Sequence, residues 1–522
     1  MNVSVTRSPL LVLSRTPYPA GILRPQGPRS TRRIHLHTTT TAAPHKYKTI
    51  DELPGPTAAD TAYLLFVKGY ADKSHAMQTE FRGRFGSLWR SRFGPLDLVN
   101  VASPELVLRL LDQEGARPVR VELSHWREYR EARGRGLGLH VSTGDSWLRL
   151  RRALDPLLLR PAAALGHAPA LRQVVEDLLA RLERLRLQRP DGGVANMQEE
   201  LYKFGFESVA AVVFETRLGC LKDRVPEETL RFIAALNAMW RLSEPVLLLP
   251  RWTRGLLPYW GRFVRAWDDI TQIADGLIER RLLVLEERSR RGAPAPEGAG
   301  LLTALLTSKT LPREEVYTTV TELLLGGVDT TSNTLCWALY HLSRDPRAQH
   351  LLHQEALSEC PDLQEPTADH LTRLPYLKAV VKETLRLYPV VPGNGRLVLE
   401  NEVYLEDYCF PRGTQFHLCH YVTGRDEAQF RASESFLPER WLRGGAGESR
   451  LPHHPYSSIP FGRGVRGCVG KRVAQLEMYL ALFRIMQHYQ VLPQDPEEVV
   501  EAKTRTLMIP GKPINLRFIP RA

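Results

Sequence analysis

The pattern of hydrophobic and polar positions predicts a chain built mostly of α-helices. Apolar residues recur at helical spacing over residues 171–300, with one break at 188–193, where a proline and an aspartate precede two glycines. A long helix is predicted over residues 313–344, and another begins at Lys471. We therefore expect a fold in which helices outnumber strands.

Short strands are predicted in two parts of the chain. Residues 96–101 have the composition of a strand, and a helix over 105–111 follows them. Alternating segments over residues 397–399, 402–405 and 414–419 predict a small β-sheet nearer the C-terminus. No stretch reaches the roughly 18–20 uncharged apolar residues that span a bilayer. The expected fold class is mainly α with small β-sheets.

Composition places the chain among ordinary globular proteins. Its 522 residues are 43% hydrophobic and 25% charged, without an internal repeat or a long linker, so one large single-fold enzyme is feasible. The six cysteines are scattered and form no C-x-x-C pair. This argues against a zinc module or a disulfide scaffold and favours a reducing compartment.

Charge is concentrated at the N-terminus. The first 50 residues hold six arginines, two lysines and no acid, so they carry +8 of the net charge of +12. This is typical of a mitochondrial transit peptide, and acids begin at Asp51. We expect a transit peptide over residues 1–43 and one domain over 44–522. The alternative is a basic arm for nucleic acid or acidic lipid, but a nucleic-acid binder would concentrate its charge in the folded part.

The strongest chemical signal is Cys468, which lies in a Gly-rich basic loop directly before the helix at Lys471. Arg463, Arg466 and the positive N-terminal end of that helix are expected to stabilise a thiolate. Glycines let the backbone approach a flat ligand closely. Cys468 is therefore a candidate metal ligand. The alternative is a buried cysteine that acts as a small hydrophobic residue.

The loop resembles the haem-binding loop of cytochromes P450. Its residues match the pattern F-x-x-G-x-R-x-C-x-G at Phe461, Gly464, Arg466, Cys468 and Gly470. The resemblance implies the P450 fold, in which a helix-rich lobe and a smaller β-rich lobe surround a buried haem b. It also implies that Cys468 is the axial ligand of the haem iron and that Phe461 and Arg466 belong to the haem site.

Further motifs resemble other parts of a P450 haem site. Trp147 and Arg151 lie four residues apart and so share a helix face. They resemble the pair that holds one haem propionate, and Arg396 resembles the arginine that binds the second. Taken alone, the W-x-x-x-R spacing more often marks a surface arginine.

Residues 326–331 are unusual for the middle of a helix. Two glycines weaken a helix, and adjacent Asp329 and Thr330 are costly in a core unless they are paired. The segment resembles the P450 signature beside the haem, which implies that Thr330 contacts dioxygen and that Asp329 relays protons to it. The alternative is a glycine kink whose threonine bonds back to a carbonyl.

Glu383 and Arg386 lie three residues apart on a predicted helix. The local interpretation is a surface salt bridge worth under ~1 kcal/mol. The pair resembles the P450 E-x-x-R motif, which binds the arginine of a downstream P-E-R segment, here Arg440. The resemblance implies that these three residues support the haem loop and take no part in catalysis.

The chain shows no nucleotide-binding fingerprint of its own, so a partner must supply electrons. Lys378 and Lys382 lie four residues apart, and Arg466, Lys471 and Arg472 add positive charge around the cysteine loop. Such a patch suits an acidic protein. The resemblance identifies the partner as adrenodoxin, which a NADPH-dependent adrenodoxin reductase reduces. The alternative is a set of solvated basic residues on an ordinary helix.

Residues 245–260 mix leucine and tryptophan with arginine, which favours a membrane interface over the alternative of a core loop. The P450 family places a substrate channel there, which implies monotopic attachment to the matrix side of the inner mitochondrial membrane.

Nearly the whole mature chain resembles the mitochondrial P450s that hydroxylate sterols and vitamin D. The resemblance implies a monooxygenase of sterol side chains, acting on cholesterol, bile-acid intermediates or C25 of vitamin D3. Residues 157–161 and 393–394 resemble instead the branch that hydroxylates 25-hydroxyvitamin D at the 1α position. A haem protein that binds sterol without catalysis is the alternative of another class, and the Asp329–Thr330 pair argues against it.

Overall fold

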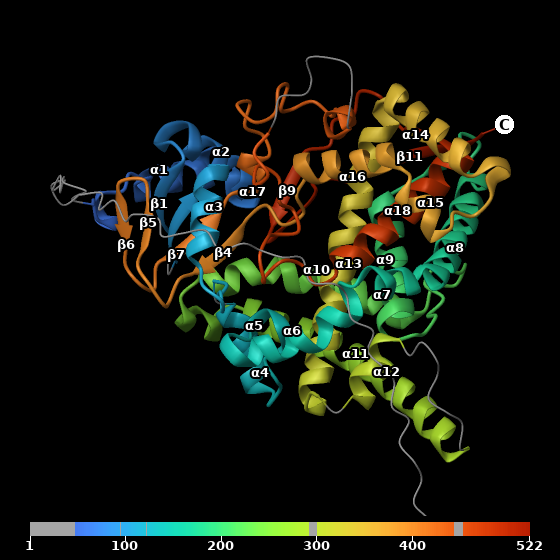
Figure 1. Ribbon diagram of the computed structural model, residues 1–522, viewed down its shortest axis with the longest axis horizontal. Coiled ribbons are helices and arrows are strands. Elements are labelled where there is room, and N and C mark those ends of the chain that lie inside the picture. The colour runs from blue at the N-terminus through green and yellow to red at the C-terminus, as the bar shows by residue number, and fades with distance from the viewer. Residues whose placement is uncertain are drawn as a thin grey trace, which may run out of the picture. The chain divides into compact units, whose positions relative to one another are not determined.

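Helices form most of the fold, as the sequence pattern predicts (Figure 1). The computed structural model describes residues 47–93, 96–121, 123–291, 300–308, 310–442 and 453–521. The predicted transit peptide, residues 1–43, lies outside these ranges. The α-helices are α1 (Ala58–Ala62), α2 (Ser74–Phe85), α3 (Pro104–Gln113), α4 (Ser124–Ala132), α5 (Gly138–Val141), α6 (Gly144–Leu158), α7 (Pro161–Gly166), α8 (Ala168–Leu187), α9 (Met197–Val213), α10 (Glu227–Leu248), α11 (Tyr259–Arg290), α12 (Leu301–Thr307), α13 (Arg313–Arg344), α14 (Pro346–Glu359), α15 (Ala368–Thr372), α16 (Pro375–Leu387), α17 (His420–Thr423) and α18 (Lys471–His488).

The strands are shorter than the helices and form small sheets. They are β1 (Leu88–Phe93), β2 (Leu96–Val101), β3 (Gly193–Val194), β4 (Asn394–Leu397), β5 (Val403–Leu405), β6 (Tyr408–Phe410), β7 (Gln415–Leu418), β8 (Tyr489–Pro493), β9 (Ala502–Arg505), β10 (Leu507–Pro510) and β11 (Leu516–Pro520). Short turns of other helix types are η1 (Ile50–Glu52), η2 (Tyr63–Val67), η3 (Tyr70–Asp72), η4 (Arg251–Gly255), η5 (Pro361–Leu363) and η6 (Pro438–Trp441).

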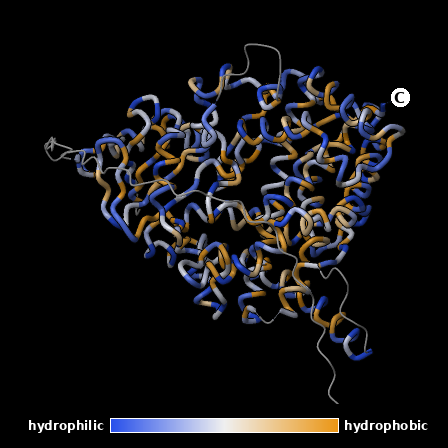
Figure 2. The backbone as a smooth tube through the Cα atoms, in the orientation of Figure 1, coloured by the Kyte–Doolittle hydropathy of each residue, from blue (hydrophilic) through white to orange (hydrophobic). Residues whose placement is uncertain are grey.

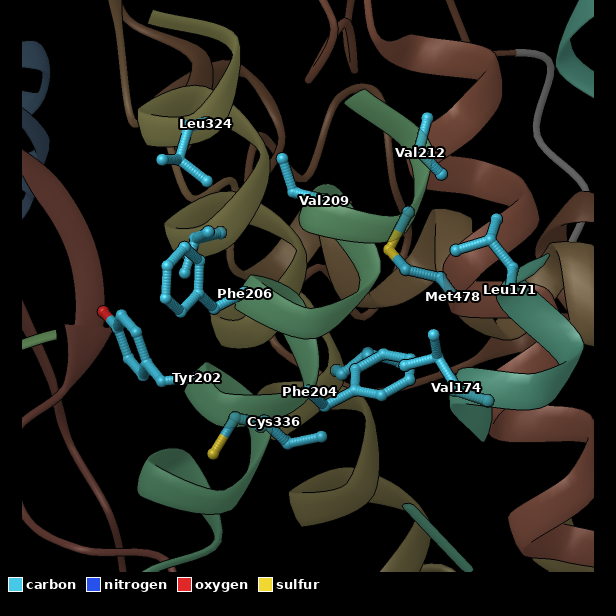
Figure 3. Close-up of a cluster of buried hydrophobic side chains, with 14 of the residues drawn as sticks. Leu171, Val174, Tyr202, Phe204, Phe206, Val209, Val212, Leu324, Cys336 and Met478 are labelled. Atoms are coloured by element: carbon cyan, nitrogen blue, oxygen red, sulfur yellow. The ribbon is translucent and has the colours of Figure 1, made fainter. Parts of the chain in front are cut away.

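The core is centred on α13, which packs against α9, α16 and α18. Side chains of α9 point in two directions (Figure 3). Phe206 lies on the α13 side with Leu324, whereas Phe204 lies near Val174 of α8 and on the same side as Met478 of α18. Hydrophobic and hydrophilic residues alternate along the helices, as expected for amphipathic helices around a shared core (Figure 2).

The main sheet joins distant parts of the chain in the order β1-β2-β7-β4. β2 and β7 pair in parallel, with Val99 opposite Phe416. The sequence prediction of one small C-terminal sheet is therefore only partly right, because β4 and β7 join the N-terminal strands while β5 and β6 form a separate hairpin. The first of those strands also ends at Leu397 rather than continuing to 399. The labelled strands β1, β4, β5, β6 and β7 lie beside α1, α2 and α3, apart from most of the long helices (Figure 1).

Several predicted boundaries agree with the structure. α13 covers residues 313–344, β2 covers 96–101, and α18 begins at Lys471 directly after the cysteine loop. Within the described residues, none of the helices combines the length and the apolar character that a membrane crossing requires.

Candidate active site

The cysteine loop folds back on itself before α18. The Cys468 N–H donates to the Phe461 carbonyl at 2.8 Å, and the Gly467 N–H donates to the Gly464 carbonyl at 3.0 Å. Gly462 and Gly464 have φ angles of 67° and 68°, a left-handed conformation that glycine adopts without strain. The Cys468 side chain remains accessible. The loop therefore presents the sulfur outward from a tightly bonded backbone.

The environment of the sulfur differs in detail from the sequence prediction. Although the Cys468 side chain is accessible, the protein packed around the sulfur desolvates it and raises the pKa of the thiol, and a hydrogen bond to the backbone of Gly470 partly opposes this effect. The cations that lower the thiol pKa most are Arg120, Arg151 and Lys471.

Arg463 and Arg466, which the sequence assigned to the sulfur, have other contacts. The Arg463 guanidinium lies 5.3 Å from the ring centre of Tyr456. Arg466 turns into the protein, where it lies 3.9 Å from the Trp147 ring and donates to the Pro118 carbonyl at 2.8 Å. The prediction therefore differs from the structure because Arg463 packs on a tyrosine ring and Arg466 is buried among other partners.

Helix α6 is bonded directly to the cysteine loop. Arg151 donates to the Gly467 carbonyl at 2.9 Å, and Trp147 of the same helix face packs under Arg466. Arg120 donates to the Arg466 carbonyl at 3.2 Å. Sequence reasoning missed Arg120, because it lies in an irregular segment with no periodic or motif signal.

The clustered arginines repel one another. Burial and then the neighbouring guanidiniums lower the pKa of Arg466 to about 9 and that of Arg120 to about 10. Arg396 belongs to the same cluster and donates to Glu114 at 2.6 Å. The Arg466 Nη1 atom is buried without a hydrogen-bond partner in the described part of the chain. Such a cluster is chemically matched to an anionic group with several oxygens, such as the propionates of a haem.

Helix α13 has an accessible stretch in an otherwise buried sequence. Gly326 is exposed, and a Cβ placed on it would meet nothing within 4 Å. Thr330, one turn later, donates to the Gly326 carbonyl at 2.7 Å. The back-bonded threonine of the local alternative is thus present, while α13 remains one continuous helix. Gly327 faces the other way, where a Cβ would lie 2.5 Å from Val209.

Asp329 is buried on the side of α13 that faces α9 and α10. Its Oδ2 atom accepts the Trp240 indole N–H at 2.6 Å. Burial raises the pKa of Asp329 to about 6, although hydrogen bonds from Tyr202 and Trp240 lower it. The carboxyl group can therefore gain and lose a proton near neutral pH. Sequence reasoning missed Trp240, because nothing local links a helix residue to a partner 89 positions away.

A second buried acid fixes α4 and α5 against α13. The Glu322 carboxylate lies 2.5 Å from the Arg130 guanidinium and accepts a hydrogen bond from the backbone N–H of His140 at 2.8 Å. Arg130 and His140 lower the pKa of Glu322 to about 2 despite its complete burial. Gly138 passes so close that a Cβ would lie 2.7 Å from this carboxyl. Glu322 therefore fixes α4 and α5 against α13 at a point one helical turn before Gly326.

Glu383, Arg386 and Arg440 form one buried network. Arg386 donates to both Glu383 oxygens at 2.7 and 2.9 Å, and Arg440 donates at 3.0 Å. The Trp441 N–H adds a bond at 2.9 Å. Arg386 also donates to the carbonyls of Gly424 and Ser433. The network ties α16 to η6 and to the chain that leads into the cysteine loop.

The basic residues assigned to a partner lie on α16 and at the start of α18. Lys382, Arg472 and Lys471 are exposed, and repulsion from Arg472 and Lys382 contributes to lowering the pKa of Lys471. Lys378 is half-buried and donates to the Thr372 carbonyl at 2.6 Å. Arg466 is not part of this patch, because its side chain is buried.

Comparison with known proteins assigns this chain to a family. The family model "Cytochrome P450" matches residues 53–518. The chain belongs to the cytochrome P450 family. The mitochondrial sterol 26-hydroxylase of Rattus norvegicus is 39% identical to this P450 over 91% of the chain and 90% of the relative. The mitochondrial 25-hydroxyvitamin D-1 alpha hydroxylase of Homo sapiens is 44% identical over 91% of the chain and 93% of the relative.

A solved structure of a "cytochrome P450DA heme domain" shares the fold. It superimposes with a TM-score of 0.75 at 24% sequence identity and covers 90% of this P450 and 97% of that chain. The predicted fold class is therefore confirmed, and the protein is a P450 monooxygenase. P450s bind haem, and an accessible cysteine beside a cluster of buried arginines fits that group.

Proposed function

We propose that this P450 is a mitochondrial enzyme that hydroxylates the side chain of sterols, with O2 and with electrons from NADPH that pass through adrenodoxin reductase and adrenodoxin. Its substrates in this proposal are cholesterol, bile-acid intermediates and vitamin D3 at C25. The observation that carries the proposal is the similarity to sterol 26-hydroxylases over nine tenths of both chains, with the motif residues assembled around one site.

In this proposal, the residues around the cysteine loop bind the haem. Cys468 binds the haem iron, and Phe461 packs within the same loop. The propionates are held by the arginine cluster and by one indole: Arg151, Arg396, Arg466, Arg120 and Trp147. When bound, the haem supplies the redox-active iron at which dioxygen is reduced.

In this proposal, Asp329 and Thr330 take part in proton transfer. Asp329 has a pKa of about 6, so a useful fraction of it exists in each protonation state near neutral pH. The Thr330 hydroxyl lies on the accessible stretch of α13 and donates its hydrogen to the Gly326 carbonyl at 2.7 Å. In this bonded state its oxygen can accept a hydrogen bond, and the hydroxyl can donate to a reacting oxygen only after it rotates away from Gly326.

The electron partner is proposed to bind the patch of Lys378, Lys382 and Arg472. The patch lies next to the loop that carries Cys468, because Lys471 and Arg472 begin the following helix. Lys382 lies 5.6 Å from the Trp441 ring, which limits its movement. An acidic ferredoxin would therefore bind directly behind the haem ligand.

Membrane attachment is supported by exposed apolar side chains. Around η4, Trp252 is 72% and Leu256 75% exposed. On η2, Phe66 is 82% and Val67 70% exposed. Such groups rarely gather on a surface that faces only water. We propose that they enter the matrix-side leaflet of the inner mitochondrial membrane.

The two apolar groups flank one hairpin. Lys503 of β9 pairs with Asp72 at 2.8 Å, five residues after η2 ends. The backbone N–H of Thr506 donates to Glu244 of α10 at 3.1 Å, five residues before Leu249. Short stretches of chain therefore connect both groups to contacts with the β9–β10 hairpin, which favours a common membrane-facing surface. Residues 1–43 are proposed to be the transit peptide.

A second candidate is 1α-hydroxylation of 25-hydroxyvitamin D. It is favoured by the 44% identity to the human enzyme of that name, against 39% for the human sterol 26-hydroxylase. Both reactions use the same haem chemistry, so the difference lies in which substrate carbon faces the site.

The deciding experiment is reconstitution of the purified protein with adrenodoxin, adrenodoxin reductase and NADPH. Cholesterol and 25-hydroxyvitamin D3 are supplied in separate reactions, and products are identified by mass spectrometry. We expect side-chain-hydroxylated cholesterol. Exclusive formation of a 1α-hydroxylated secosteroid would assign the second candidate. Lys382→Gln with Arg472→Gln should raise the KM for adrenodoxin, whereas Lys222→Gln on another exposed surface should not.

A further inference from the structure

A cavity of about 300 Å³ lies against the buried side of Asp329. It is bounded by residues of α9, α10, α13 and the β9–β10 hairpin, and we call it the α10 cavity. Its polar wall includes Tyr202, Trp240, Arg241, Asp329 and Arg505. The cavity has room for several water molecules, since one water occupies about 30 Å³ of liquid.

The Asp329 carboxyl is held in the wall of this cavity from two helices. Trp240 of α10 donates its indole N–H at 2.6 Å, and Tyr202 of α9 supplies a second bond. Asn333 in turn donates to the Tyr202 hydroxyl at 3.0 Å. Figure 3 shows this hydroxyl pointing out of the apolar cluster around it. The carboxyl group is thus fixed by specific donors and not by packing alone.

The side chains of Asp329 and Thr330 point to different sides of α13. Neighbouring residues of an α-helix point about 100° apart, since one turn takes 3.6 residues. Thr330 shares its side with the exposed Gly326, whereas Asp329 is buried toward α10. A proton that reaches Asp329 through water therefore arrives from the α10 cavity.

We infer that Trp240 is a positioning residue that holds the Asp329 carboxyl in the wall of the α10 cavity, where the carboxylate takes its proton from a hydronium ion that water in the cavity delivers. This inference rests on the proposed function and deepens its proton relay. In the step, an O–H bond of a hydronium ion breaks, an O–H bond forms on Asp329, and a neutral water remains. No electron is transferred.

The groups around Asp329 set the direction of the expected effect. Tyr202 of α9 and Trp240 of α10 act on its carboxyl directly, while Arg241 of α10 and Arg505 of β9 line the same cavity. Burial raises the pKa of Asp329, and the bonds from Tyr202 and Trp240 lower it. Loss of the Trp240 N–H should therefore raise the pKa of Asp329 further, because the charged carboxylate loses a donor.

The test compares two tryptophan variants by infrared titration of the folded protein. Trp240→Phe removes the N–H and keeps an aromatic ring. Asp329→Asn identifies the C=O band of the protonated Asp329 carboxyl by its loss. The matched control is Trp126→Phe, because the Trp126 ring lies 5.6 Å from that of Trp240 while its own N–H has no partner in the described part of the chain.

We expect the band of Trp240→Phe to titrate about one pH unit higher than in the wild type, the size of one lost bond to a charged carboxylate. Trp126→Phe should titrate like the wild type. Tyr202→Phe, which removes the second donor, should shift the midpoint of the Asp329 titration in the same direction. This variant replaces Trp240→Phe in the test if Trp240→Phe does not fold.

Turnover separates this inference from the proposed function. In the reconstituted system, Trp240→Phe should move the pH dependence of product formed per NADPH oxidised by the same amount as the band. A shifted band in a protein that hydroxylates neither substrate would support the positioning role and reject the proposed function. An unshifted band in Trp240→Phe, or an equal shift in Trp126→Phe, would overturn the inference.

Discussion

At the scale of single residues, the site is defined by buried charges that compensate one another. Glu383 accepts bonds from Arg386, Arg440 and Trp441, and all of these groups are wholly or largely buried. Removing the acid leaves two guanidiniums buried without their counter-charge. Uncompensated burial of charge is among the most destabilising changes a protein can undergo.

Glu383→Gln is therefore expected to lower the free energy of unfolding by about 3–5 kcal/mol. Chemical denaturation followed by circular dichroism measures the change. Glu287→Gln serves as the control, because within the described residues Glu287 forms its ion pairs with Arg290 and Arg291 at the exposed end of α11. The control should change stability by under ~1 kcal/mol. Equal effects of the two variants would contradict the structural role of the network.

Glu477 of α18 gives a prediction about pH. Burial raises the pKa of this carboxyl from 4.5 to about 8, and one of its oxygens has no hydrogen-bond partner in the described residues. Below pH 4.5 the group is protonated in both folded and unfolded chains. As the pH rises from there, the unfolded chain releases the proton and the folded chain keeps it, so stability falls until about pH 8.

Glu477→Gln removes this titration while keeping the shape of the neutral side chain. We expect the variant to lose less stability than the wild type between pH 5 and pH 8, with an upper limit of roughly 4 kcal/mol. Melting temperatures across this range measure the difference. Parallel pH profiles of the two proteins would show that Glu477 ionises freely in the folded state.

At the scale of elements, two neighbouring glycines of α13 have opposite roles. Gly326 faces open space, whereas a Cβ on Gly327 would lie 2.5 Å from Val209 of α9. The sequence marked both glycines as unusual without distinguishing them. The difference depends on which helix packs beside each one, and α9 is more than a hundred residues away.

Gly327→Ala should destabilise the protein by about 1–3 kcal/mol, because the branched Val209 side chain cannot move aside easily. Gly326→Ala should instead be neutral or stabilise the fold by up to about 1 kcal/mol through helix propensity. It should also weaken imidazole binding to the haem protein, since the methyl group enters the accessible stretch beside Thr330. Denaturation and spectral titration measure the two effects, and the reverse order of stabilities would contradict the packing.

The elements themselves follow from local sequence. Hydrophobic periodicity predicts α13, and the residues after Gly470 predict α18. Both predictions succeed because helix formation depends on neighbours within one or two turns of the chain. The pairing of β2 with β7 does not follow, since more than three hundred residues separate the two strands. For the same reason the sequence missed Arg120 and Trp240, which gain their roles only through partners on distant elements.

At the scale of the whole molecule, the proposed membrane attachment through the exposed apolar side chains around η2 and η4 can be tested directly. Trp252 and Leu256 make few contacts within the fold, so replacing them should leave its stability unchanged. Trp252→Ser with Leu256→Ser is expected to weaken binding to phospholipid vesicles at least tenfold, because burial of two large side chains is worth about 3 kcal/mol or more. Vesicle sedimentation measures the change.

Leu283→Ser is the matched control for this prediction. Leu283 of α11 is 61% exposed but lies outside the two apolar groups around η2 and η4. Its replacement should leave vesicle binding unchanged. A similar loss in both variants would mean that general hydrophobicity, and not this surface, determines binding.

The proposed function requires that Cys468 binds haem iron through its sulfur. The most direct test is the absorption spectrum of the purified, reduced protein under carbon monoxide. We predict the strongly red-shifted Soret band of a haem with a thiolate ligand in the wild type, and its loss in Cys468→Ala. A wild-type protein without that band, or a Cys468→Ala variant that keeps it, would contradict the account.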